Sequence, residues 1–284
     1  MTGSNKVTVY TPQSALSHPV AFFAEMFRDL WRSRELAWRL FIRDISAQYR
    51  QSILGYVWAF LPPLVSSLTF VFLNSQGLFK TEDTVIPYAA FALIGTLLWQ
   101  VFVDALVSPL NALTLSKPML TKINFPREAI LLGALGVVIF NFLVRLILLV
   151  AVLVWFKVPL TAGTLFLPVG AVALILCGTA FGLLVLPLGG LYGDVARAIP
   201  IFTGFWMLLT PVVYPARTEG WAGLLVTLNP VSPLIVTTRE FLTGQAPTLL
   251  QPFLSVSVIS LLVVFLGWMG FRLAMPHLIE RMGG

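Results

Sequence analysis

The sequence predicts an all-α integral membrane protein with six transmembrane helices, an N-terminal amphipathic interface helix and a re-entrant segment at the outer face before the last span. Three observations predict this fold. Apolar residues make up 58% of the 284 residues and charged residues only 11%, a balance typical of membrane proteins. Apolar runs recur at about the 20 residues that a helix needs to cross a hydrocarbon core of about 30 Å. A basic and aromatic stretch at helical spacing directly precedes the first of these runs.

Residues 34–52 are predicted to form the interface helix, after a cytosolic segment, residues 1–33, to which we assign no function. One face carries ring and aliphatic side chains at helical spacing, namely Trp38, Phe41, Ile42, Ile45 and Tyr49. Another face carries polar side chains, namely Arg39, Arg43, Ser46 and Arg50. Such a helix lies in the membrane interface with its guanidinium groups toward phosphates and cytosol. A soluble surface helix is the alternative, which the apolar run that follows disfavours.

The transmembrane domain is predicted to occupy residues 53–284. Its six spans are Ile53–Ser75, Pro87–Ser108, Ala129–Phe156, Leu165–Leu188, Ala198–Tyr214 and Pro252–Met275. With the N-terminus in the cytosol, most of the 18 Lys and Arg residues lie inside, as the positive-inside rule requires. The basic residues left outside are Lys80, Lys157, Arg217 and Arg239. Both termini are then cytosolic, and the polar first twenty residues do not resemble a cleavable signal peptide.

A seventh apolar stretch, Gly220–Thr238, is not expected to cross the membrane. The sequence Asn229-Pro230-Val231-Ser232-Pro233 interrupts it and leaves two pieces too short to span. Irregular backbone at membrane depth is tolerated only where protein covers it or it lines a cavity. Residues 215–250 are therefore predicted to dip in from the outer face and return, as a lid over an exit.

Arg145 lies well inside the third predicted span. A charge there costs about 2.5–3.5 kcal/mol on insertion scales, so it usually faces a bundle interior or water. Asn141 lies one turn earlier on the same face, whereas Asp104 lies near the cytosolic end of its own span. At a rise of 1.5 Å per residue the gap between Asp104 and Arg145 is about 10 Å, beyond the expected reach of one side chain. Arg145 is expected either to pair with a neighbour or snorkel outward, or to guide an anionic substrate.

Prolines divide the predicted spans. Pro62-Pro63 are expected to bend the first span, and Pro187 with the following glycines to end the fourth, because proline removes a backbone donor.

The loop 109–128 between the second and third spans mixes charged residues with exposed Met, Leu, Ile and Phe. A docking surface for a cytosolic partner explains these apolar residues better than a solvated loop does. The turn Gly193–Arg197 is a candidate second contact.

Several function classes lack the residues that they need. The lone cysteine, Cys177, excludes an intrachain disulfide and a cysteine metal site. No GxxxxGK[ST] phosphate loop occurs, and His18 and His277 lie at opposite ends of the chain. We therefore expect no catalytic residue, metal site or bound cofactor in this chain. The net charge of +6 comes from basic residues beside the spans, which favours anionic lipids and cytosolic protein over nucleic acid as partners.

Four sequence blocks carry a resemblance to a known family. They are RDISAQYRQSILGYVWAFLPPL, KPMLTKINFPRE, LYGDVARAIPIFTGFWMLLTPVVYP and LNPVSPLIVTTREFLTG. In order and spacing they resemble the membrane permeases of ABC-2 type polysaccharide exporters, which export O-antigen, capsule or teichoic acid. The resemblance implies a homodimer of six-span subunits in the cytoplasmic (inner) membrane, with two copies of a separate cytosolic ABC ATPase that bind ATP and Mg²⁺.

The same resemblance implies roles for particular residues. ATPase coupling falls to Lys117, Lys122, Phe125, Pro126 and Arg127, with a lesser contact at Tyr192 and Asp194. The interface helix flanks the substrate's entrance, where the headgroup candidates are Arg39, Arg43 and Arg50. The candidate channel aromatics are Tyr56, Trp58, Trp99, Phe102 and Trp206. The outer gate is assigned to Pro211, Tyr214, Pro215, Asn229, Pro230 and Pro233.

The expected substrate is an undecaprenyl-linked, O-antigen-like polysaccharide. One alternative is an ABC-2 permease for a drug or small lipid, which would tolerate loss of the channel aromatics. A membrane-embedded glycosyltransferase or acyltransferase is a second alternative, and it would need convergent acids or histidines that the sequence does not show. A passive scaffold, the third, predicts no ATPase partner.

Overall fold

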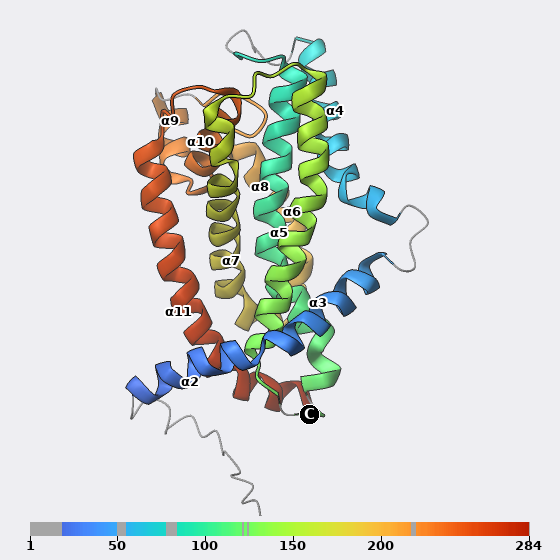
Figure 1. The fold of residues 1–284 in the computed structure, drawn as a ribbon, viewed down its shortest axis with the longest axis vertical. Coiled ribbons are helices and arrows are strands. Elements are labelled where there is room, and N and C mark those ends of the chain that lie inside the picture. Colours follow the sequence, from blue (N-terminus) through green and yellow to red (C-terminus); the bar gives the residue numbers. More distant parts are fainter. Residues whose placement is uncertain are drawn as a thin grey trace, which may run out of the picture.

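The computed structural model describes residues 19–49, 55–77, 84–120, 122–123, 125–216 and 220–283. Every regular element in these ranges is a helix, as the sequence predicts. In chain order they are α2 (Pro19–Arg32), α3 (Arg34–Tyr49), η1 (Gly55–Ala59), α4 (Leu61–Ser75), α5 (Tyr88–Leu120), α6 (Glu128–Trp155), η2 (Ala162–Phe166), α7 (Leu167–Leu191), α8 (Gly193–Leu209), α9 (Gly220–Leu228), α10 (Val231–Thr243) and α11 (Leu250–Gly283). Figure 1 shows long helices side by side, with α2 and α3 across the end that carries the C-terminus. We call this the α2 end, and the opposite end, with α9 and α10, the α10 end.

Four helical segments are long and apolar enough to cross a membrane, so the chain is a multi-pass membrane protein. They are Tyr88–Leu120, Glu128–Trp155, Ala162–Leu191 and Leu250–Arg281. α4 has 15 residues and α8 has 17. At 1.5 Å per residue they extend about 22 and 25 Å, less than a hydrocarbon core of about 30 Å. The prediction of six spans therefore depends on these two shorter helices.

Two helices continue past their predicted ends, Ser108 and Leu188. α5 runs through Pro109 and Pro118 to Leu120, so most of the predicted loop 109–128 is helical. α7 likewise passes Pro187 and ends at Leu191. Proline removes one helical donor, but neighbouring helices can hold such a helix together in a membrane. Pro109 is buried, which is consistent with support from packing.

The first predicted span is not one continuous helix. η1, a short 3₁₀ helix, comes first, and Pro62 and Pro63 lie in the first turn of α4 rather than within a span. Proline is favoured there because the first helical N–H groups have no intrahelical partner. The two prolines therefore start α4 instead of bending it.

Glycines on α7 allow it to pack tightly against α5. A Cβ at Gly182 would lie 2.6 Å from the carbonyl oxygen of Leu106, and one at Gly178 would clash with the carbonyl oxygen of Phe102. Small residues four apart let two membrane helices approach backbone to backbone. This contact positions α5 at the centre of the described bundle, with α4, α6, α7 and α8 around it.

The predicted interface helix, α3, packs along α6. Ala37 and Leu40 are buried, and the Cβ of Leu40 would lie 3.3 Å from a Cβ at Gly133. Trp38 and Ile42 keep 64% and 45% of their surface exposed. These two apolar side chains are therefore exposed, while Ala37 and Leu40 on another side of α3 pack against the bundle; the position of α3 in the membrane interface stays a prediction.

The sequence interpretation missed α2. Phe22 and Met26 are buried, and the rings of Phe23 and Phe27 contact Phe265 and Trp268 of α11. A proline at the first helical position followed by apolar residues at helical spacing was the available signal.

An ion cluster ties α2 to the rest of the bundle. Arg272 of α11 donates to Asp29 of α2 and to Glu128 at the start of α6, both at 2.7 Å. All three side chains are less than one-fifth exposed. The N-terminal helix α2 is thereby joined to the last helix and to Glu128, at the end of the predicted coupling loop.

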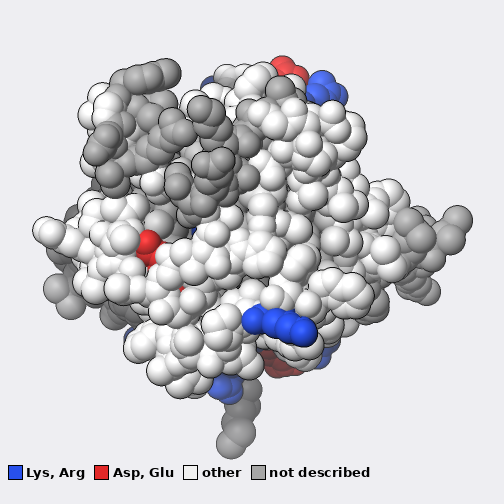
Figure 2. Space-filling view, turned by 90° about the horizontal axis from the view of Figure 1, so that it is seen from above, with Lys and Arg blue, Asp and Glu red and all other residues white. Residues whose placement is uncertain are grey.

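The α10 end carries few charges on its surface. Seen from that end, nearly all described atoms belong to uncharged residues (Figure 2). The basic residues of α2 and α3 lie at the opposite end (Figure 1). This distribution favours the predicted orientation, with the α2 end in the cytosol.

Candidate functional site

Polar side chains follow one side of α5 through the middle of the bundle. Gln100, Asp104, Ser108 and Asn111 succeed one another at steps of four, four and three, so they share a face of the helix. Polar groups at this depth in a membrane helix face either the bundle interior or water. We call these four residues the polar face of α5.

A buried ion pair occupies the centre of the polar face. Nη1 of Arg145 lies 2.5 Å from Oδ2 of Asp104, and the two side chains are only 7% and 15% exposed. Asn141 and Gln100 also donate to the Asp104 carboxylate, at 3.2 and 3.1 Å. Arg145 donates from Nε to the carbonyl of Ala59 at 3.1 Å. The charge of Arg145 is thus neutralised within the chain.

The prediction that Asp104 lies out of reach of Arg145 is wrong. Side chains on a helix lean toward its N-terminus. α5 and α6 run in opposite directions (Figure 1), so Asp104 leans toward the α10 end and Arg145 leans toward the α2 end. The two side chains therefore extend toward each other, and the long side chain of Arg145 spans the remaining distance to Asp104. Counting residues along the axis alone overestimated the separation.

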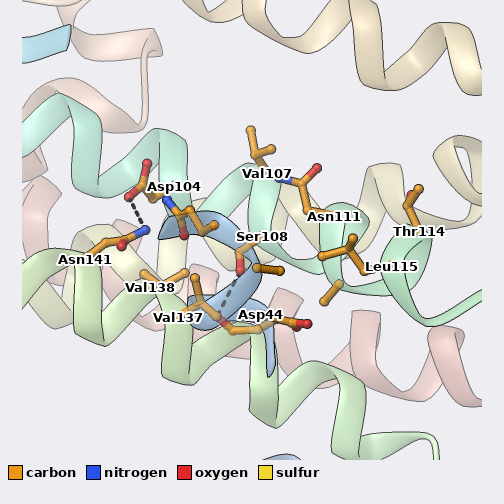
Figure 3. Close-up of a pocket in the computed structure, with 14 residues that line it drawn as sticks. Asp44, Asp104, Val107, Ser108, Asn111, Thr114, Leu115, Val137, Val138 and Asn141 are labelled. Atoms are coloured by element: carbon orange, nitrogen blue, oxygen red, sulfur yellow. Dashed lines mark hydrogen bonds between the residues drawn. The ribbon is translucent and has the colours of Figure 1, made fainter. Parts of the chain in front are cut away.

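A cavity of about 530 Å³ lies between α3, α5 and α6. We call it the α3 cavity; its polar lining consists of Asp44, Gln48, Asp104, Ser108, Asn111, Thr114 and Asn141. Figure 3 shows Asp104 and Asn141 pointing toward each other on one side, with Asn111 and Thr114 along α5 on the other. The cavity therefore extends from the interface helix to the buried ion pair.

A second cavity, of about 210 Å³, lies between α4, α5 and α8. Ser66, Thr96, Gln100 and Thr203 provide its polar groups, and Val107 lines both cavities. The two cavities are therefore neighbours along the same side of α5. Both place polar groups in a region that the helix composition makes otherwise apolar.

The predicted channel aromatics fall into different environments. Trp99 is 4% exposed but lines the second cavity. Phe102 is completely buried among Trp99, Phe181 and Trp206 at ring-centroid distances of 5.2–6.2 Å. Phe102 is thus packed in the core in this conformation, and its role as a channel aromatic stays a prediction. Trp58 is 53% exposed, and the side chain of Tyr56 lies outside the described residues.

The segment predicted as an outer gate contains two short helices broken at Asn229 and Pro230, as expected. Oδ1 of Asn229 accepts hydrogen bonds from Nε1 of Trp206 and from the backbone of Val231, both at 3.1 Å. Its Nδ2 donates to Thr210 at 2.8 Å. Asn229 therefore joins the break in this segment to the end of α8 and to the aromatic cluster.

The other predicted gate residues surround this break. Pro211 and Pro233 are buried, whereas Tyr214, Pro215 and Pro230 are half-buried. Tyr214 donates its hydroxyl to the carbonyl of Leu208 at 3.0 Å. This bond ties the chain after α8 back to the last turn of α8.

Arg239 was expected at the outer surface, but it is only 5% exposed within α10. Its Nη1 and Nη2 donate to the carbonyls of Val212 and Pro211 at 2.8 Å, and its guanidinium lies 3.7 Å from the ring centre of Phe91. Burial lowers the pKa of Arg239 to about 9, still above neutral pH. Residues 231–240 are all buried, and the sequence VSPLIVTTREFLT has no periodic pattern that would have marked Arg239 as buried.

The residues predicted to couple to an ATPase lie at the α2 end. Nζ of Lys117 donates to the carbonyl of Gly190 at 3.2 Å, so the end of α5 meets the end of α7, just before Tyr192. Tyr192 is 57% exposed, and Asp194, 92% exposed at its side chain, pairs with Arg197 in the first turn of α8. The two predicted contact regions are therefore adjacent.

The short connection between α5 and α6 completes this surface. Lys122 is exposed, whereas Phe125, Pro126 and Arg127 are half-buried. Phe125 packs against the apolar cluster that includes Leu278 of α11. Phe125 thus anchors the connection to the bundle, while the charged side chain of Lys122 is exposed on the surface.

The arginines assigned to headgroup binding differ in how free they are. Arg39 is exposed and pairs with Glu35 at 2.9 Å. Arg43 donates to Asp44 at 2.8 Å and to Ser116 at 3.2 Å, which ties α3 to the end of α5. Arg50 lies outside the described residues. Of the two that are described, Arg39 is the more accessible to a lipid phosphate.

Comparison with known proteins gives a consistent result. A curated O-antigen export system permease protein RfbA of Myxococcus xanthus is 23% identical over 244 residues, 84% of this chain and 92% of that protein. Two proteins of the same name from Klebsiella pneumoniae are each 23% identical over 210 residues, 71% of this chain and 78% of theirs. A sequence profile of the ABC-2 type transporter family matches residues 35–242, from the interface helix to α10. This chain, a multi-pass helical membrane protein, belongs to the ABC-2 type transporter family.

Proposed function

We propose that this chain is the permease subunit of an exporter that moves a lipid-linked, O-antigen-like polysaccharide across the cytoplasmic membrane. The observation that carries the proposal is the polar face of α5 with its two neighbouring cavities, in a helix long and apolar enough to cross a membrane. The relatives named as O-antigen export permeases support the substrate class.

A second copy of the chain completes the passage in this proposal. Asn111 is exposed at the edge of the described bundle, and Gln100, Asp104 and Ser108 are only partly covered. Bare polar groups facing lipid are costly. Association of two copies through α4, α5 and α8 would enclose these groups around water and substrate. Local thinning of the bilayer allows α4 and α8 to complete six crossings per copy.

Energy for export comes from two copies of a cytosolic ABC ATPase, which bind ATP and Mg²⁺. The ATPase docks at the α2 end, where Lys117 joins α5 to α7 near Tyr192. Because α5 and α7 are packed backbone to backbone, displacement at their ends is transmitted along both helices. ATP binding shifts the permease only insofar as the ATP-bound ATPase has different affinities for the two permease states.

The substrate approaches along the cytosolic leaflet on an undecaprenyl carrier. Its phosphates meet Arg39 at the surface of α3, and the glycan passes along the polar face of α5. At the α10 end, the segment held by Asn229 and Arg239 opens to release it. Both termini of the permease lie in the cytosol.

Deletion and complementation test the proposal. Deleting this chain in its host should remove the polysaccharide from the cell surface and leave it inside, and the wild-type chain should restore display. An affinity-tagged permease should co-purify a nucleotide-hydrolysing subunit. Unchanged surface glycan together with purification of the chain alone would overturn the proposal, while drug sensitivity with normal glycan would favour a small-molecule permease.

A further inference from the structure

The α3 cavity offers hydrogen-bonding groups that the chain itself leaves unused. Gln48 and Asn111 both line it, and the side chain of neither residue makes a hydrogen bond in the part of the chain that the structure describes. The Asp44 carboxylate, only 8% exposed at its side chain, is held in place by a hydrogen bond from Arg43 to one of its oxygens. Amide and carboxylate groups of this kind pair with hydroxyl groups.

The cavity carries no net charge that would select an anion. Each of its two carboxylates has an arginine partner, Arg43 for Asp44 and Arg145 for Asp104. Neither Lys nor Arg is among its 14 described lining residues. A phosphate placed inside would lose its hydration and meet two carboxylates without a free cation. No interaction in the cavity would offset that desolvation cost. A neutral, hydroxyl-rich ligand fits this arrangement.

Apolar walls complete the environment. Val107, Leu115, Val137 and Val138 line the cavity between its polar groups (Figure 3). A sugar ring presents hydroxyls at its edge and C–H groups on its faces, so it can use both kinds of wall. The volume of about 530 Å³ lies within the range of about 300–1,000 Å³ that small-ligand pockets occupy.

We infer that the α3 cavity is a binding subsite for a neutral sugar unit of the exported glycan, recognised through Asp44, Gln48 and Asn111 at the cytosolic start of the passage. The inference rests on the proposed function. Arg43 acts as a positioning residue, because it orients Asp44. The sugar binds in the cavity while the lipid phosphates remain at the surface of α3.

Thiol protection tests occupancy of the cavity. The native Cys177 is 1% exposed, so a single engineered cysteine can be followed after a brief reaction with a water-soluble maleimide. Leu115→Cys, on an apolar wall of the cavity and 53% exposed, is compared with Ala24→Cys, an exposed position on α2 away from the cavity. The complex with its ATPase is labelled without ATP in two membranes, one from cells that make the glycan and one from cells that lack its first sugar transferase.

Leu115→Cys should react about tenfold more slowly in membranes that contain the glycan, because occupancy of nine sites in ten leaves one in ten open. Ala24→Cys should react equally in both. Equal rates for Leu115→Cys overturn the inference: fast in both means an unoccupied cavity, and slow in both means that a second copy or a lipid headgroup fills it. The bare lipid carrier is present in both membranes, so it cannot produce the difference.

Export measurements separate this inference from the proposed function. Gln48→Leu and Asn111→Leu should each slow the appearance of surface glycan about tenfold, the effect of losing one or two hydrogen bonds. Gln251→Leu, an exposed amide at the start of α11, is the matched control and should leave the rate unchanged. Normal export by both cavity variants overturns the subsite while the permease function stands. Failure of the wild-type chain to restore surface glycan overturns the function itself.

Discussion

Asp104 and Arg145 are individually costly in a membrane helix, and each makes the other tolerable. Asn141, Gln100 and the carbonyl of Ala59 complete their hydrogen bonding, so the pair is satisfied on several sides. A buried pair of this kind contributes little net stability compared with apolar residues, but removing one partner is expensive. Its retention beside two cavities is consistent with a need for polarity along the passage.

Replacing Asp104 by Asn should destabilise the protein by about 3–5 kcal/mol, because the buried guanidinium loses its counter-charge. The double variant Asp104→Leu with Arg145→Met should recover most of that loss. Thermal unfolding of the purified complex measures both. Equal destabilisation by the single and the double variant would show that the two residues do not act as a pair.

Arg239 is a second buried cation, satisfied by carbonyls rather than by a carboxylate. Arg239→Met should loosen the chain at Pro211 and Val212, since each hydrogen bond to a charged group contributes about 1.5–3 kcal/mol. Hydrogen exchange of residues 211–216 measures the loosening. Lys157→Met removes an exposed positive charge and should have no such effect. Equal hydrogen exchange in the two variants would contradict a role for Arg239 in holding residues 211–216 in place.

At the scale of elements, the contact between α5 and α7 determines where the polar face lies. Gly182→Ala should destabilise the bundle by about 1–3 kcal/mol, because the new Cβ would lie 2.6 Å from the carbonyl oxygen of Leu106 and force the helices apart. Gly270→Ala is the matched control, since nothing lies within 4 Å of its added Cβ. Thermal unfolding compares the two, and similar stabilities would rule out close approach as the reason for the glycine.

The attachment of α2 depends on Arg272. Arg272→Gln should leave Asp29 and Glu128 without their cation and release α2 from the bundle, so that residues 19–32 become more sensitive to protease. Arg281→Gln changes an exposed arginine elsewhere on α11 and should leave the proteolysis of residues 19–32 unaltered. Unchanged protection of α2 in the Arg272 variant would mean that its aromatic contacts with α11 suffice.

Sequence patterns predicted elements better than they predicted contacts. Apolar run length located the long helices, and Asn229-Pro230 correctly separated α9 from α10. Run length could not show that α5 continues past Pro109, because the supporting contacts come from other helices. Residue counting missed the Asp104–Arg145 pair, since it ignored the direction in which side chains lean. The core position of Phe102 could not be predicted from span membership alone; its place two residues from both Gln100 and Asp104, opposite the polar face of α5, was the available signal.

At the scale of the whole molecule, a series of contacts links the two ends. Lys117 joins α5 to α7 at the α2 end, and the polar face of α5 continues to the ion pair. The rings of Phe102 and Trp206 then connect α5 to α8, and Trp206 bonds to Asn229 in the predicted gate. Displacement at the α2 end can therefore reach the α10 end through packed side chains.

Reconstitution tests the central claim most directly. The permease and its ATPase are inserted together into liposomes that hold the lipid-linked glycan in their outer leaflet, with the cytosolic side facing outward. Adding ATP and Mg²⁺ should move the glycan into the lumen, where an added glycosidase no longer cleaves it, and liposomes lacking either subunit should show no protection. Glycan that stays cleavable with both subunits and ATP present, or that becomes protected without the permease, would contradict the account.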